Sequence, residues 1–133
     1  YSNFGHGVDL VAPGGGSEAA LPNDPNCTPD AKSGRNVQQV SVKHGQYGDF
    51  SIPRNRSGRL GLKGTSMAAP HVTGVIALLL ASKVLGAHPT TQQISQRLTD
   101  TARDLGAPGP DRYYAAGLVD AAAALRGTKT PPA

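Results

Sequence analysis

The sequence has 133 residues, of which 38% are hydrophobic and 5% aromatic, and it contains no tryptophan. This length suits one small domain or part of a larger one, and so few aromatic residues predict a thin core for an independent fold. The net charge is +4, but no aromatic residues interleave with the basic ones at base-stacking spacing, so we do not expect nucleic-acid binding.

The first predicted element is a short buried strand at residues 8–12, which the glycine-rich turn at 13–16 ends. Residues 15–58 are rich in glycine, proline, asparagine and basic residues, so we predict a long loop or hairpin insert there. Strand-like alternation occurs within it at 37–42 and 47–52. The insert also contains Cys27, the single cysteine, which cannot close a disulfide within this chain and whose partner is left open.

A long apolar helix is predicted over residues 66–85. Its apolar residues recur at three- and four-residue steps and cover almost every face, which indicates central burial. The expected core residues are Val75, Ile76 and Leu79. Pro70 is placed near the first turn, where a missing N–H costs least, and Gly86 is expected to end the helix. Polar residues bound an apolar run that is shorter than the about 18 residues of a membrane span, and no signal peptide is visible.

A second, amphipathic helix is predicted over residues 90–99, after Pro89. Its apolar stripe consists of Ile94, Leu98 and Ala102. A loop rich in glycine and proline follows at 105–111, and an alanine-rich segment then predicts a closing helix before a tail or linker at 127–133.

The segment Gly64-Thr65-Ser66-Met67-Ala68-Ala69-Pro70-His71-Val72 delivers a serine to the start of the long helix. A helix N-terminus has free N–H groups and a partial positive charge, which can stabilise the oxyanion formed when a serine oxygen attacks a carbonyl. Gly64 lets the backbone approach a substrate closely. The structural alternative is that Ser66 only caps a core helix. The Gly-x-Ser-x-Gly turn of the α/β-hydrolases does not match, because Ala68 occupies the position of the second glycine.

This nonapeptide resembles the serine-nucleophile motif of the subtilisin-like serine proteases, the subtilases of peptidase family S8. Similar runs at 2–14, ending in Ala-Pro-Gly, and at 117–120, before the closing helix, extend the resemblance over most of the chain. It implies an α/β fold, a subtilisin-like three-layer sandwich with a central parallel sheet. Residues 1–126 would be the C-terminal part of that peptidase domain, so the chain would begin within it.

The resemblance implies that Ser66 is the nucleophile of a serine endopeptidase that works through an acyl-enzyme, and that its backbone N–H helps to form the oxyanion hole. The implied substrate-binding residues are Leu62, Lys63, Gly64, Thr65 and Met67. Leu62 and Lys63 stand on the leaving-group side, where many subtilases have an aromatic residue and an asparagine, so specificity there is left open.

A serine nucleophile needs a histidine base and an orienting carboxylate, and in subtilisin order both precede the serine. None of the four histidines (His6, His44, His71 and His88) stands in the His-Gly-Thr-His motif that carries the base in the family, and Asp9 lacks the Thr/Ser-Gly turn of the catalytic aspartate. His71 follows Ser66 by five residues, about 140° round a helix, and is expected to be packed or hydrogen-bonded. The catalytic Asp and His and the oxyanion Asn are therefore expected in an upstream part of the same domain.

That upstream part and a protein or peptide substrate are the expected partners. No histidine, cysteine or acidic cluster has metal-ligand spacing, so no cofactor is identifiable, although the resemblance allows calcium and implies secretion. Two other functions stay open: a truncated or cleaved subtilase piece with a structural or binding role, and an esterase-type serine hydrolase on another fold.

Overall fold

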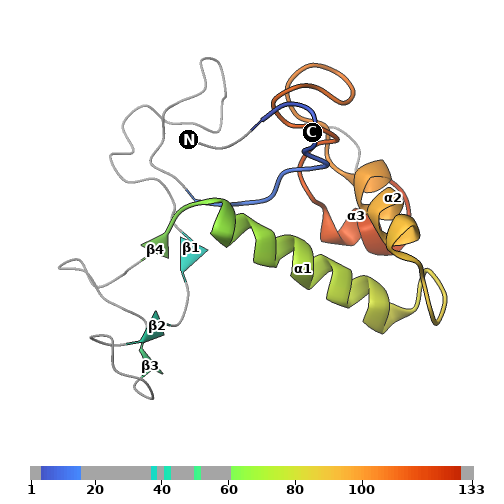
Figure 1. The fold of residues 1–133 in the computed structure, drawn as a ribbon. Helices are drawn as coiled ribbons and strands as arrows, with labels where there is room; N and C mark the ends of the chain where they lie inside the picture. The colour runs from blue at the N-terminus through green and yellow to red at the C-terminus, as the bar shows by residue number, and fades with distance from the viewer. Residues whose placement is uncertain (1–3, 16–36, 39–40, 43–49, 52–60, 130–133) are drawn as a thin grey trace. The chain divides into compact units, whose positions relative to one another are not determined.

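The computed structural model describes residues 4–15, 37–38, 41–42, 50–51 and 61–129. Two compact units contain them: a helical unit made of Tyr1–Pro13 and Ala68–Ala133, and a strand unit made of Gly14–Met67. The elements in chain order (Figure 1) are β1 (Val37–Gln38), β2 (Ser41–Val42), β3 (Phe50–Ser51), β4 (Gly61–Leu62), α1 (Thr65–Ser82), α2 (Thr91–Thr101) and α3 (Ala121–Arg126).

The strand unit contains two short antiparallel pairings. β1 pairs with β4, which places Val37 opposite Leu62, and β2 pairs with β3, which places Val42 opposite Phe50. The second pairing agrees with the predicted hairpin. The predicted piece at 37–42, however, is divided between the two pairings, because alternation indicates a strand but does not specify its partner. Cys27 and most of the insert lie outside the described residues.

Helix α1 begins at Thr65 and ends at Ser82, earlier than the predicted end. Lys83 takes the left-handed conformation, with φ 55°, and so ends the helix before the expected glycine stop. Gly86 instead closes the next turn, where its N–H donates to the Lys83 carbonyl at 2.9 Å. The prediction that Gly86 ends α1 is therefore wrong by one turn.

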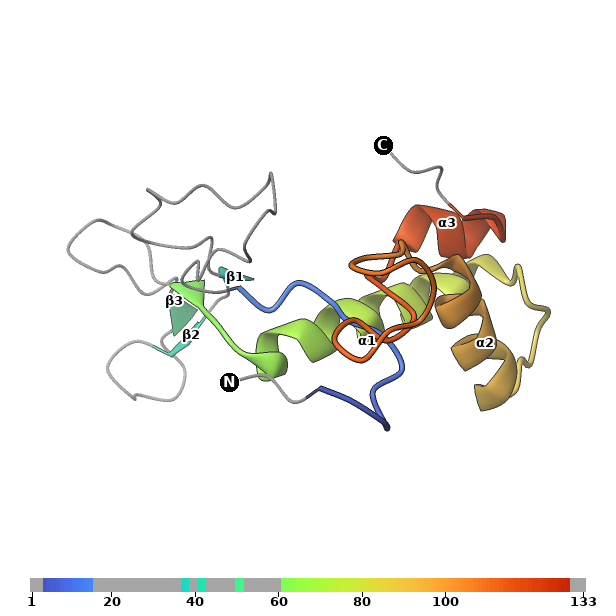
Figure 2. The same ribbon diagram turned by 90° about the horizontal axis from the view of Figure 1, so that it is seen from above.

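The core of the helical unit forms from one face of α1 together with α2 and α3. Its buried residues are Val75, Leu79, Leu98 and Ala124. α2 and α3 lie side by side, as Figure 2 also shows. Leu79 is fully buried and Val75 nearly so, as predicted, whereas Ile76 is half-buried against this cluster.

The rest of α1 is less buried than its composition predicts. Leu78 is 49% exposed and Leu80 is 46% exposed, and in the described structure Val75 and Leu79 are the two buried residues of the helix. Large apolar side chains in water forgo the free energy that burial would supply. The predicted central burial is thus found on one face of α1.

By length and composition alone, α1 is also long and apolar enough to cross a membrane, since its 18 residues have a mean hydropathy of 1.4. One such helix is weak evidence, because the core helix of a water-soluble domain passes the same test. The absence of a membrane span inferred from the sequence therefore stays a prediction.

Helix α2 has the amphipathic pattern expected from its sequence. Its stripe is confirmed, because Leu98 and Ala102 are buried and Ile94 packs against the core. Its start is a capping box: the Thr90 hydroxyl accepts from the Gln93 N–H at 3.2 Å, and the Gln93 side chain accepts from the Thr90 N–H at 2.8 Å. The helix thus satisfies two of its own terminal N–H donors.

The predicted strand at 8–12 is reduced to one parallel bridge between Val11 and Leu118. Leu118 also forms an antiparallel bridge with Arg103, so three separate segments meet at one residue. Among the described residues this is the extent of parallel pairing. The central parallel sheet and its three-layer sandwich therefore stay predictions. The closing helix, α3, begins after Asp120, whose carboxylate accepts from the Ala123 N–H at 2.8 Å.

Candidate active site

The connection from β4 to α1 is a tight turn held at Gly64. The Gly64 N–H donates to the Gly14 carbonyl at 2.7 Å, and the Gly64 carbonyl accepts from the Met67 N–H at 2.9 Å. Its φ of 145° lies in a region that side chains rarely adopt. The backbone on both sides of this glycine is therefore held in one conformation.

Ser66 is the second residue of α1, and its side chain is exposed. The first N–H groups of a helix have no intrahelical acceptor, and they form the positive end of the helix dipole. The first turn of α1 contains no acidic residue that would compete for them. The start of α1 therefore presents an accessible hydroxyl beside backbone donors, as an oxyanion site requires.

Pro70 lies deeper in the helix than the sequence suggests. It is the sixth residue of α1, so its missing N–H leaves the Ser66 carbonyl without its usual donor four residues on. The prediction that this proline costs least in the first turn is therefore wrong. α1 therefore lacks the backbone hydrogen bond that the carbonyl of its candidate nucleophile would otherwise accept.

The other predicted substrate-binding residues lie on either side of Ser66 along the chain. Lys63 and Thr65 are exposed, and Met67 is half-buried. Leu62 is the last residue of β4 and pairs with Val37 of β1. These residues therefore span the end of strand β4, the hydrogen-bonded turn at Gly64 and the start of helix α1.

The described histidines are His6, His71 and His88, and all three are exposed, while His44 lies outside the described residues. α1 carries both Ser66 and His71, and five residues place them about 140° apart around the helix axis. The helix geometry therefore excludes the motif's own histidine as the base for this serine. His71 is not packed in this structure, and the hydrogen-bonded alternative that we also expected stays a prediction. Asp9 is exposed as well.

Among the residues that the structure describes, no group of three or more histidine, cysteine or acidic side chains could hold a metal ion. Calcium therefore has no identified ligands here, and no step below depends on it.

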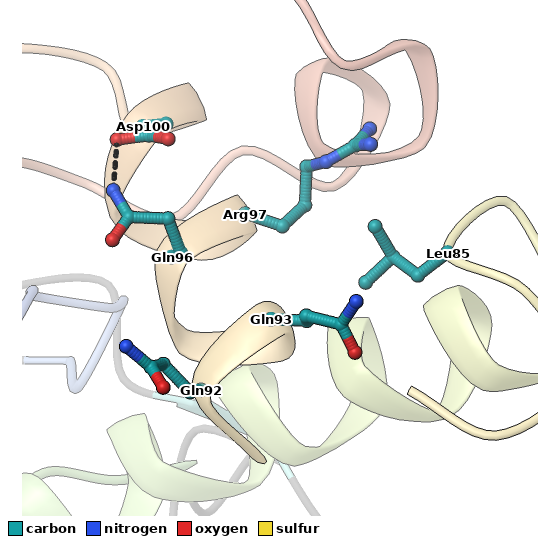
Figure 3. A pocket seen from close by; sticks show the side chains of 6 residues that line it. All are labelled: Leu85, Gln92, Gln93, Gln96, Arg97 and Asp100. Carbon is teal, nitrogen blue, oxygen red and sulfur yellow. Dashed lines mark hydrogen bonds between the residues drawn. The ribbon is translucent and has the colours of Figure 1, made fainter. Parts of the chain in front are cut away.

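A separate hollow of about 350 Å³ lies against α2 and Leu85 (Figure 3). Its lining includes three glutamines, of which Gln93 and Gln96 form hydrogen bonds that stabilise the fold. Gln93 completes the capping box, and the Gln96 amide donates to Asp100 at 2.7 Å. Arg97 donates to the Ala124 carbonyl at 3.0 Å. The hollow shares no residue with the serine motif, and we interpret it as part of the structural surface.

Carboxylates organise the loop between α2 and α3. Asp111 accepts hydrogen bonds from the backbone N–H groups of Tyr114, Tyr113 and Ala107, at 2.8, 2.7 and 3.2 Å. These bonds, led by that from Tyr114, lower the pKa of Asp111 from its ordinary value, against a raising contribution from desolvation. Asp104 likewise accepts from the Gly109 N–H at 2.6 Å. The backbone of this loop is thus held by hydrogen bonds to two carboxylate side chains.

Sequence reasoning missed Gly14 as part of the candidate site. It interpreted residues 13–16 only as the end of a strand, whereas the Gly14 carbonyl accepts from the Gly64 N–H and fixes the turn before Ser66. The two glycines are far apart in the sequence, so no local pattern predicts their pairing. The one feature of the sequence that could have indicated this contact is that both turns contain glycine.

Comparison with known proteins finds similarity to subtilases along most of the chain. The family model described as "Subtilase family" (Peptidase_S8) matches residues 1–117. Fervidolysin from Fervidobacterium pennivorans is 35% identical over 127 residues, which cover 96% of this chain and 16% of that protein. Subtilisin from Bacillus pumilus is 31% identical over 128 residues, which cover 95% of this chain and 32% of that protein.

The "Extracellular serine protease" of Serratia marcescens is 44% identical over 66 residues, which cover 50% of this chain and 6% of that protein. A solved structure described as "Crystal Structure of a Lanthipeptide Protease" is similar with a TM-score of 0.62 and 27% identity, over 95% of this chain and 37% of that one. The chain therefore spans about a third or less of the length of these curated relatives.

Proposed function

This chain belongs to the subtilase family of serine proteases, and we propose that residues 1–126 form the C-terminal part of a subtilisin-like peptidase domain, with 127–133 as a tail or linker. For the complete domain we propose a three-layer sandwich around a central parallel sheet. The likeness to the lanthipeptide protease structure supports a subtilisin-like fold. Residues 15–58 would be an insert in that domain.

We propose that Ser66 is the catalytic nucleophile of a serine endopeptidase. The observation that carries this proposal is the exposed Ser66 hydroxyl at the second position of α1, directly after the pinned Gly64 turn. Its oxygen would attack the peptide carbonyl and release the amine, and water would then hydrolyse the acyl-enzyme. The Ser66 N–H would donate to the oxyanion.

The proton of Ser66 requires a base, which we propose is supplied by an upstream part of the same domain together with the orienting Asp and the oxyanion Asn. Two features of the helical unit support such a partner. Leu78 and Leu80, which lie on nearly opposite sides of α1, are both exposed. An apolar hollow of about 520 Å³ also opens between residues 7–10, α1 and α2, beside Val72 and Ile94.

The proposed substrate is a protein or peptide, held near the nucleophile by the run that includes Leu62, Lys63, Gly64, Thr65 and Met67. We also propose that the protein is secreted, for which the name of the Serratia marcescens relative is the support. On this proposal the apolarity of α1 belongs to a domain core and not to a membrane span.

The test is labelling of the complete protein with a fluorophosphonate probe. We expect the probe to modify Ser66, and Ser66→Ala to abolish both labelling and peptide hydrolysis. Ser82→Ala is the matched control, because Ser82 is the last residue of the same helix and its hydroxyl donates to the Leu79 carbonyl at 3.1 Å. This control should keep full activity.

The other outcomes identify the competing functions. A folded Ser66→Ala protein with unchanged hydrolysis would disprove the nucleophile assignment. Absence of labelling in the complete, folded protein would instead favour a catalytically inactive subtilase piece. Hydrolysis of esters with no hydrolysis of peptides would favour the esterase. The isolated chain should stay essentially unlabelled, because it has no matching base motif, and brisk labelling of it would mean that a base lies within these residues.

A further inference from the structure

Two exposed aromatic rings contact each other in the helical unit. Phe4 is 54% exposed and Tyr113 is 65% exposed, and their ring centroids lie 5.4 Å apart with 35° between the ring planes. The Arg112 guanidinium lies over the Phe4 ring, 5.4 Å from its centroid. Both contacts are favourable at these distances, yet more than half of each aromatic residue stays in water. This surface can therefore bind a ligand that packs on aromatic rings.

Backbone hydrogen bonds hold the segments that carry these side chains. The Gly5 N–H donates to the Arg112 carbonyl at 2.9 Å, which joins the N-terminal segment to the loop before α3. In that loop the Asp111 carboxylate accepts from the Tyr113 N–H at 2.7 Å, and Asp111 and Ala115 exchange two backbone hydrogen bonds of 3.1 and 3.0 Å. A ligand would therefore meet an ordered backbone, which lowers the entropic cost of binding.

A hollow of about 460 Å³ adjoins the aromatic pair. It is lined by residues 5–9 and by residues 110–112, 115 and 116, so Arg112 belongs both to the hollow and to the aromatic contact. In the described part of the chain, three of its polar side chains form no hydrogen bond or ion pair: His6, Asp9 and Arg112. The guanidinium supplies donors, the Asp9 carboxylate supplies acceptors, and the imidazole can supply either.

The charges in this hollow argue against a strongly charged ligand. Arg112 is cationic, whereas Asp9 and Asp111 carry carboxylates, so the attraction of an ion by one group is opposed by another. A neutral ligand with many hydroxyls avoids this conflict, because each hydroxyl both donates and accepts. The C–H face of a sugar ring is also apolar enough to pack on an exposed aromatic ring. These observations favour a carbohydrate.

We propose that Phe4, Arg112 and Tyr113, together with the adjoining hollow, bind a neutral carbohydrate chain. One sugar ring packs on the exposed Tyr113 ring, and its hydroxyls form hydrogen bonds with Arg112 and Asp9. The site is a binding site without a catalytic role, and the inference does not depend on the role of Ser66.

The test is isothermal titration calorimetry of the complete protein with three hexasaccharides: the neutral oligomers of glucose and of N-acetylglucosamine, and the anionic oligomer of galacturonate. We expect a neutral oligomer to bind with an affinity that salt changes little, because the ligand carries no charge. If the folded protein bound neither neutral oligomer, or bound the anionic one alone, the proposal would be overturned.

Variants then locate the site. Tyr113→Ala should weaken binding by about twofold to tenfold, the size of one aromatic contact, whereas Tyr113→Phe keeps the ring and should keep most of the affinity. Arg112→Ala should also weaken binding, because it removes the guanidinium donors. Arg126→Ala is the matched control, since Arg126 is exposed in the last turn of α3 and does not line the hollow.

Equal affinity of Tyr113→Ala and the wild type would overturn the proposal, as would an equal loss in Arg126→Ala. Ser66→Ala should bind the sugar like the wild type. A loss of sugar binding in that variant would contradict a separate site, whereas a loss of proteolysis alone concerns only the proposed nucleophile.

Discussion

Helix α1 and the segment from α2 to α3 differ in where their stabilising interactions come from. α2 has a capping box, α3 has an Asp120 cap and a left-handed Gly127, and Arg97 joins the two by donating to the Ala124 carbonyl. α1 contains Pro70, has no acidic residue in its first turn or basic residue in its last, and buries two of its 18 residues. The helix that carries the candidate nucleophile is therefore the one that depends most on contacts outside itself.

This difference agrees with the proposed function. A helix that is apolar on all sides is stable only when its other faces are also covered. The segment 90–127, by contrast, caps the starts of both of its helices with its own side chains. A comparison of variants in the two regions can therefore show whether α1 depends on the rest of the domain.

The largest effect is expected in α1. Leu79→Ala should lower the free energy of unfolding of the complete protein by about 2–5 kcal/mol, because Leu79 is fully buried and the change leaves a cavity. Chemical denaturation monitored by circular dichroism measures this. Leu78→Ala sharpens the comparison, since its side chain is 49% exposed in this chain. A comparable loss at Leu78 would indicate that the rest of the domain covers this face, whereas an unchanged stability of Leu79→Ala would refute its burial.

The next effect concerns the loop before α3. Gly117→Ala should destabilise the protein by at least about 2 kcal/mol, because a Cβ at this φ of 115° would overlap the Arg103 carbonyl that pairs with Leu118. Ala115→Gly tests the reverse change, from alanine to glycine, at another position of the same loop that has a positive φ. Ala115 has a φ of 52°, so glycine should raise stability by about 0.5 kcal/mol. Thermal melts of both variants measure this, and equal shifts would contradict the backbone argument.

A smaller loss is expected at the start of α2. Thr90→Ala removes the hydroxyl that accepts from Gln93 and should cost about 1 kcal/mol. Thr91→Ala, one residue further along and within the helix, should be neutral or slightly stabilising because alanine has the higher helix propensity. Urea unfolding compares the two, and equal effects would show that the capping box contributes little.

The smallest effect should depend on pH. The folded pKa of Asp111 is lowered from the ordinary 3.8, so its stabilising contribution is present above that value and is lost as the pH falls through the folded pKa. Asp111→Asn should therefore differ from the wild type most at neutral pH and least in strong acid. Unfolding measured at several pH values between neutrality and strong acid tests this. A difference that grows toward low pH would have the wrong sign.

Local patterns predicted much of the helical unit. The apolar stripe of α2 and the buried positions Val75 and Leu79 follow from the period of the α-helix, which acts between neighbours three and four residues apart. The end of α1 was predicted less well, because Lys83 adopts a conformation usually left to glycine. The start of α1 was predicted to within one residue, so Pro70 is the sixth residue of the helix where the prediction made it the fifth.

The sequence by itself determined the family and the candidate nucleophile, because the motif around Ser66 and the start of α1 are defined by residues adjacent in the chain. Only the tertiary structure decided that Gly14 pins the turn at Gly64, that residues 37–42 divide between two strand pairings, and that Leu118 bridges both Val11 and Arg103. These are hydrogen bonds between residues far apart in the sequence. Their partners depend on the path of the whole chain, which no local periodicity records.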